Sequence, residues 1–95
     1  MSMVPVQIVS PLHQSEKHAN QSVTFTCHLT HNDIPVTWSK DGVEIAANTK
    51  HKLTILGNVH KLTINNLDLY DEAVYMLKID SSEKTSSAML FLEGL

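Results

Sequence analysis

Apolar and polar residues alternate along much of this chain, which is the pattern of strands that bury one face. The clearest case is residues 22–30, in which Val23, Phe25, Cys27 and Leu29 are apolar and the residues between them are polar. Because successive side chains of a strand point to opposite faces, those four side chains should enter the core. Similar short runs predict further strands over residues 4–9, 35–40, 43–45, 51–55, 60–64, 73–79 and 85–92.

Turn-forming residues separate these runs. Asp41-Gly42 and Gly57-Asn58 each stand between two runs, as hairpin turns do, and residues 80–83 predict a loop. Residues 14–21 are polar and should contain a turn near Ala19-Asn20. Short strands at hairpin spacing predict an all-β fold. We expect one domain over residues 1–95, a β-sandwich of two antiparallel sheets with seven to nine strands.

Residues 67–79 join a polar turn to one of the predicted strands. Asp71 stands just before the strand, where its carboxylate can accept hydrogen bonds and close a corner. Tyr75 follows four residues later, on the same strand face as Ala73 and Leu77. We therefore expect the Tyr75 ring to be buried and its hydroxyl to turn back onto the upstream backbone.

Charge narrows the classes of partner. The net charge is −3, and all seven basic residues are lysines. Nucleic-acid binding generally uses clustered positive charge and favours arginine. The sequence also lacks a polybasic segment for a membrane surface and an apolar run of about 20 residues that could span one. We therefore expect neither nucleic acid nor a membrane as partner.

The number of cysteines indicates whether the protein is secreted or stays inside the cell. Cys27 is the single cysteine, so the chain has no internal disulfide, whereas small secreted domains usually have one. The first residues also lack the basic and apolar regions of a signal peptide. Both features favour a cytoplasmic location. Asn20-Gln21-Ser22 fits the glycosylation sequon, which would matter only in a secreted protein.

Five motifs are spread along the chain: Val23-x-Phe25-x-Cys27, Val36-x-Trp38-x-Lys40-Asp41-Gly42, His60-x-Leu62-x-Ile64, Leu67-x-x-x-Asp71-x-Ala73-x-Tyr75-x-Leu77 and Ser87-Ala88-x-Leu90. Together they resemble immunoglobulin-like domains of the intermediate set, or I-set, over nearly the whole chain. Leu77 departs from the pattern, because extracellular members have a cysteine at this place. Intracellular members from the muscle proteins titin, myosin-binding protein C, obscurin and myomesin commonly lack the disulfide, and this chain looks most like them.

The resemblance implies where the core lies. Cys27 and Leu77 should face each other across the two sheets, with Trp38 packed over them and Leu77 filling the space of the missing sulfur. The structural core implied in this way is Cys27, Trp38, Leu62, Asp71, Tyr75 and Leu77.

The resemblance also implies a function. It predicts a non-catalytic structural and protein-binding module in a multi-domain protein of the sarcomere or cytoskeleton, of which this chain would be a fragment. The implied partners are myosin, actin or adjacent immunoglobulin and fibronectin domains, and the isolated domain should be monomeric. The alternative is an extracellular cell-adhesion or receptor domain, favoured only by the fold and by Asn20.

Candidate chemistry is sparse. Six histidines suggest a metal site, but their spacing does not predict convergence, and we expect six exposed or half-exposed imidazoles: His13, His18, His28, His31, His51 and His60. Asp71 and Glu72 are adjacent and should point apart. No serine or cysteine stands in a strained elbow or glycine-rich loop. We therefore predict no catalytic residues, no metal and no cofactor.

Surface binding is the remaining activity. Val74 and Met76 should point outward from one strand, and Met89 and Phe91 from its hairpin neighbour, with Thr37 and Ser39 beside them. Four apolar side chains on one solvent face would form a patch of a few hundred Å², a size that often marks an interaction site. Two further candidates are the loop 31–34 and the edge formed by residues 4–9, although its prolines are typical of edge protection.

Overall fold

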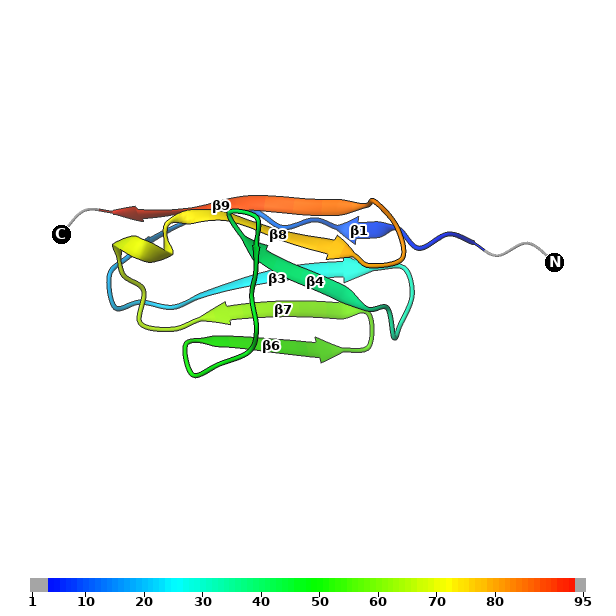
Figure 1. Ribbon diagram of the computed structural model, residues 1–95, viewed down its shortest axis with the longest axis horizontal. Coiled ribbons are helices and arrows are strands. Elements are labelled where there is room, and N and C mark those ends of the chain that lie inside the picture. Colours follow the sequence, from blue (N-terminus) through cyan, green and yellow to red (C-terminus); the bar gives the residue numbers. More distant parts are fainter. Residues whose placement is uncertain (1–3, 94–95) are drawn as a thin grey trace.

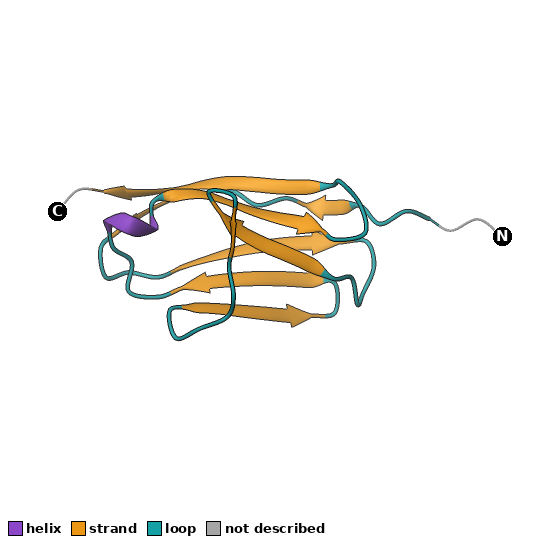
Figure 2. Cartoon of the chain, viewed as in Figure 1, coloured by secondary structure: helices purple, strands orange, loops and turns teal. Residues whose placement is uncertain are grey.

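The computed structural model describes residues 4–93, which form nine strands and one short 3-10 helix, η1 (Figures 1 and 2). Their bounds follow the predicted runs to within about two residues in most cases. The elements are β1 (Ile8–Ser10), β2 (Ser15–His18), β3 (Val23–Leu29), β4 (Val36–Lys40), β5 (Val43–Glu44), β6 (His51–Leu56), β7 (Val59–Ile64), η1 (Leu69–Asp71), β8 (Ala73–Ile79) and β9 (Thr85–Glu93).

The strands form two sheets, which confirms the predicted β-sandwich. One sheet has the order β1-β3-β7-β6 and the other the order β2-β9-β8-β4-β5. Burial alternates along β3, where Val23, Phe25, Cys27 and Leu29 are buried as expected. Within the described residues, the two ends of the chain lie at opposite ends of the long axis of the domain (Figure 1).

One edge differs from the two antiparallel sheets that we predicted. We predicted no strand over residues 15–18, but they form β2, which pairs parallel to β9. The chain leaves β1 and crosses to the other sheet at Pro11 and Leu12 without reversing. Leu12 is buried there, and its amide donates to Ser86 Oγ at 2.8 Å. Because β2 has no apolar residue, its hydrophobic pattern could not reveal it.

The N-terminal edge strand is shorter than predicted. We expected a strand over residues 4–9, but β1 covers only Ile8–Ser10. Just before β1, Gln7 forms two hydrogen bonds with Thr30. The Gln7 amide donates to Thr30 Oγ1 at 2.9 Å, and the Gln7 carbonyl accepts from the Thr30 amide at 3.0 Å. The partner strand β3 ends at Leu29, so it does not continue beside residues 4–6.

The core lies between the sheets where the sequence predicts it. Cys27, Leu62, Tyr75 and Leu77 have no exposed surface, and Trp38 is 4% exposed. The rings of Phe25 on β3 and Tyr75 on β8 stack with centroids 5.2 Å apart, so one aromatic pair spans both sheets. Burial raises the pKa of the Cys27 thiol, which keeps it protonated inside the core.

The corner before β8 also forms as predicted. The Tyr75 hydroxyl donates to the Asp71 carbonyl at 2.6 Å, and burial raises the pKa of that hydroxyl. Asp71 is 3% exposed, and its carboxylate accepts from the Asp68 amide at 2.8 Å. Asp68 in turn caps η1 by accepting from the Tyr70 amide at 2.9 Å. The segment that leads into β8 is therefore fixed by its own side chains.

Candidate protein-binding surface

The outward face of the five-stranded sheet carries the four apolar side chains that we expected there. Val74 and Met89 are direct cross-strand partners on β8 and β9, and Met76 follows Val74 on the same face. Val74 is 42% exposed and Phe91 39% exposed, while Met76 and Met89 are half-buried. We call Val74, Met76, Met89 and Phe91 the outward patch.

Polar residues border the outward patch on both sides. Ser39 on β4 is the cross-strand partner of Met76, and Thr37 is the partner of Lys78, as expected for the Trp38 strand. On the opposite side, Glu16 of β2 lies in register with Phe91. An apolar strip with a polar rim is typical of protein-binding surfaces.

The side chains of Asp41 and Glu72 accept hydrogen bonds from the backbone of the two strands that carry the outward patch. Asp41 Oδ1 accepts from the Val74 amide at 2.9 Å, and the Asp41 amide donates to the Val74 carbonyl at 2.9 Å. Asp41 and Gly42 both have positive φ, which this tight turn requires and which Gly adopts most easily. At the other strand, Glu72 Oε2 accepts from the Leu92 amide at 2.8 Å. Both strands that carry the patch are therefore hydrogen-bonded to side chains of the neighbouring turns.

The other two surface candidates lie together at the N-terminal end of the domain. A pocket of about 350 Å³ brings residues of the loop 31–34 against the segment 4–6 and against the loop between β8 and β9. Lys84 Nζ donates to the Val6 carbonyl at 2.6 Å and fastens these parts to each other. The sequence pointed to both segments but gave no signal that they meet, because they are far apart in the chain.

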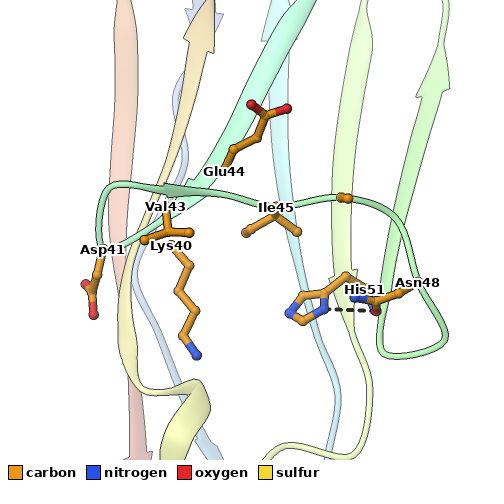
Figure 3. Close-up of a pocket in the computed structure, with 8 residues that line it drawn as sticks. Lys40, Asp41, Val43, Glu44, Ile45, Asn48 and His51 are labelled. Atoms are coloured by element: carbon orange, nitrogen blue, oxygen red, sulfur yellow. Dashed lines mark hydrogen bonds between the residues drawn. The ribbon is translucent and has the colours of Figure 1, made fainter.

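A second pocket, of about 400 Å³, lies where the chain crosses from β5 to β6 (Figure 3). Val43 and Ile45 lie on one side of it and His51 on the other. Asn48 accepts from the His51 amide at 2.7 Å and lies 3.1 Å from His51 Nδ1. The sequence does not predict this pocket, because its lining comes from β4, from the crossing after β5 and from His51 of β6, which meet only in the folded domain.

The expectation of six exposed or half-exposed histidines was wrong for His60. His60 is 1% exposed, and neither ring nitrogen has a hydrogen-bond partner among the described residues. It stands two residues before Leu62 on β7 and therefore shares the inward face, so the alternation already contained this signal. Burial lowers the pKa of the His60 imidazole.

Neither a metal centre nor a membrane span is visible in residues 4–93. No three histidine, cysteine, aspartate or glutamate residues of this part of the chain converge on one point. None of its helices is long and apolar enough to cross a membrane.

Comparisons with known proteins agree with the fold. The family model of the immunoglobulin I-set domain matches residues 6–93. Human slow-type myosin-binding protein C is 27% identical over 93% of this chain, which spans 8% of that protein's length. Titin of Drosophila melanogaster is 37% identical over 75% of this chain, which spans a share of titin that rounds to 0%. The crystal structure of titin domain I10 superposes with a TM-score of 0.89 at 28% identity, covering 95% of this chain and all of that domain.

Proposed function

Because this chain belongs to the immunoglobulin I-set domain family, we propose that it is a non-catalytic, protein-binding module of a larger protein of the sarcomere or cytoskeleton. Relatives named myosin-binding protein C and titin support this assignment. The proposal includes a cytoplasmic location, because Leu77 takes the place of a disulfide-forming cysteine and leaves Cys27 a free buried thiol.

The observation that carries the proposal is the outward patch. Val74 and Phe91 each leave about two fifths of their surface exposed on the five-stranded sheet, beside the half-buried Met76 and Met89. Methionine is flexible and polarisable, which suits it to contact surfaces. Burial of such side chains against a partner contributes about 25 cal/mol for each Å² of apolar surface removed from water.

The placement of the chain ends supports a position within a row of domains. The described residues begin at one end of the long axis and finish at the other (Figure 1). Domains with this geometry can follow one another without folding back, and the sheet faces stay free along the row. A filament protein or a neighbouring domain could then contact the outward patch from the side.

Co-sedimentation with preformed filaments tests this function. We expect the domain to pellet with myosin filaments more strongly than with actin filaments, since the relatives include myosin-binding protein C. The double variant Met76→Ser with Phe91→Ser should bind about tenfold more weakly and melt as a folded domain, because these side chains lie outside the core cluster.

A matched control removes exposed apolar surface elsewhere. Val9→Ser with Leu56→Ser changes two side chains that are 63% and 78% exposed and belong to the other sheet. This variant should bind as the unchanged domain does. Equal binding by the patch variant and the control would remove the outward patch from consideration.

The extracellular alternative rests on one residue. Asn20 of the glycosylation sequon is exposed and lies in a turn with a φ of 70°. Mass spectrometry of the native protein distinguishes the two functions. Glycan mass on Asn20 would support an adhesion or receptor domain and contradict the cytoplasmic location.

A further inference from the structure

The two sheets leave four edge strands, and β6 differs from the other three. The edges of the four-stranded sheet are β1 and β6, and those of the five-stranded sheet are β2 and β5. The strand β5 has two residues, β2 is polar and charged, and β1 is short and bordered by Pro5 and Pro11. Such features protect edges from pairing with another chain. The six residues of β6 include no proline, and Leu53, Ile55 and Leu56 are 37%, 62% and 78% exposed.

The register of β6 shows which backbone groups are free. Leu56 pairs with Val59 across a two-residue turn, and the Lys50 carbonyl accepts from the Asn65 amide at 3.0 Å. Backbone groups of successive residues in a strand point to opposite sides. The even-numbered residues of β6 therefore bond to β7, and the odd-numbered residues His51, Leu53 and Ile55 direct their backbone groups away from the sheet.

Asn48 forms hydrogen bonds with the outward-directed backbone groups at one end of this edge, those of His51. Asn48 Oδ1 accepts from the His51 amide at 2.7 Å, and the Asn48 amide donates to the His51 carbonyl at 2.9 Å. No comparable contact satisfies Leu53 or Ile55 within the described residues. Their two amides and two carbonyls are spaced as a partner strand requires.

The charge of the four-stranded sheet is opposite to that of the whole chain. The domain has a net charge of −3, yet β1, β3, β7 and β6 contain no aspartate or glutamate. Lys52 and Lys61 are exposed on the outer face of β6 and β7, and neither forms a salt bridge in the described structure. An incoming strand would therefore meet positive charge on one face and the apolar side chains of Leu53 and Ile55 on the other.

We propose that β6 binds an extended peptide segment by strand addition, and that this segment alternates apolar and acidic side chains. Its backbone pairs with the free groups of Leu53 and Ile55. Its apolar side chains lie beside those of Leu53 and Ile55, and its acidic side chains lie beside Lys52. This site is on the opposite sheet from the outward patch and is independent of it.

A second copy of this chain fits the edge less well. Pairing of β6 with another β6 would bring two lysine-bearing edges together, and like charges across strands are destabilising. One six-residue strand also buries far less than the roughly 1,200 Å² of total surface that a stable dimer needs. A short acidic strand avoids this repulsion, and a small contact area is compatible with the weak, transient binding of a peptide.

Amide hydrogen exchange followed by NMR tests the proposal residue by residue. The probe is a capped peptide of about six residues, a typical strand length, that alternates valine and glutamate. On peptide addition, the amides of Leu53 and Ile55 should exchange more slowly, whereas those of Lys52 and Thr54 should change little because β7 already protects them. Binding should weaken as salt is raised.

Two variants and two control peptides sharpen the test. Ile55→Pro removes a free amide donor but no β6–β7 hydrogen bond, and should weaken binding about tenfold. Ile55→Ser, which keeps the donor and removes only the apolar contact, should weaken it less and serves if the proline variant does not fold. A peptide with its valines and glutamates in separate blocks, and one with lysine in place of glutamate, should not protect Leu53 or Ile55.

Three results would overturn the proposal. The first is an unchanged exchange rate for Leu53 and Ile55 at peptide concentrations that saturate any binding signal. The second is protection of the outward patch in their place. The third is protection of Leu53 and Ile55 that rises with protein concentration when no peptide is present, which would assign the edge to a second copy of this chain.

Discussion

Lys50 Nζ lies 2.8 Å from Asp71 Oδ2, and this ion pair fastens the segment before β6 to the corner before β8. Asp71 is 3% exposed, so its carboxylate has little contact with water. Lys50 also donates to the Asn66 carbonyl at 2.8 Å. One lysine therefore satisfies two oxygen atoms of the turn that connects β7 to β8.

Lys50→Met should lower the free energy of unfolding by about 1–3 kcal/mol, because it leaves a buried carboxylate without its cation. Urea denaturation measures this change. Lys52→Met is the matched control, since Lys52 is exposed and forms no salt bridge in the described structure, and it should change stability by less than about 0.5 kcal/mol. Equal effects of the two variants would contradict a structural role for the ion pair.

Tyr75→Phe should destabilise the domain by about 1–2 kcal/mol. The variant keeps the ring that stacks on Phe25 but removes the donor to the Asp71 carbonyl, which leaves a buried acceptor unpaired. Thermal and urea denaturation both report the change. Tyr70→Phe provides the control, because Tyr70 is 86% exposed, and a loss of stability there as large as at Tyr75 would count against the corner.

Trp38→Ala should cost roughly 3–5 kcal/mol and unfold much of the population. Trp38 is 4% exposed and belongs to the core cluster together with Cys27 and Leu77, so its removal leaves a large cavity between the sheets. Circular dichroism at increasing temperature measures the effect. A melting temperature within a few degrees of the unchanged domain would be incompatible with this core.

Stability should fall as the pH drops below about 6.5, in part because of His60. Burial lowers the pKa of His60 in the folded domain below its ordinary value of 6.5. Below pH 6.5 the unfolded chain therefore binds more protons than the folded domain, and protonation favours unfolding. For one group the slope cannot exceed about 1.4 kcal/mol per pH unit, and the loss ends once the pH is below the lowered pKa.

His60→Leu identifies the contribution of this residue, because leucine does not titrate. Urea denaturation at a series of pH values between about 5 and 7.5 should show a flatter profile for the variant. Burial also lowers the pKa of His51, which acts in the same direction, so His51→Gln should remove a further part of the slope. An identical pH profile for the unchanged domain and His60→Leu would show that His60 does not limit acid stability.

Local alternation explains why so much could be predicted. A strand has a period of two residues, so the sequence alone places Val74 and Met76 on the face opposite Tyr75 and Leu77. The same rule places Phe25 and Cys27 in the core. The protein-binding role of the outward patch stays a prediction, since position on a face does not identify a partner.

The faces of most strands, the main turns and the corner at Tyr75 can be predicted from the sequence, because each depends on residues only a few positions apart. Features that join distant segments become visible only in the folded domain. The parallel pairing of β2 with β9, the contact of Lys50 with Asp71 and the free edge at Leu53 and Ile55 all belong to this class. Strand order fixes these relationships, and strand order comes from packing the two sheets around one core.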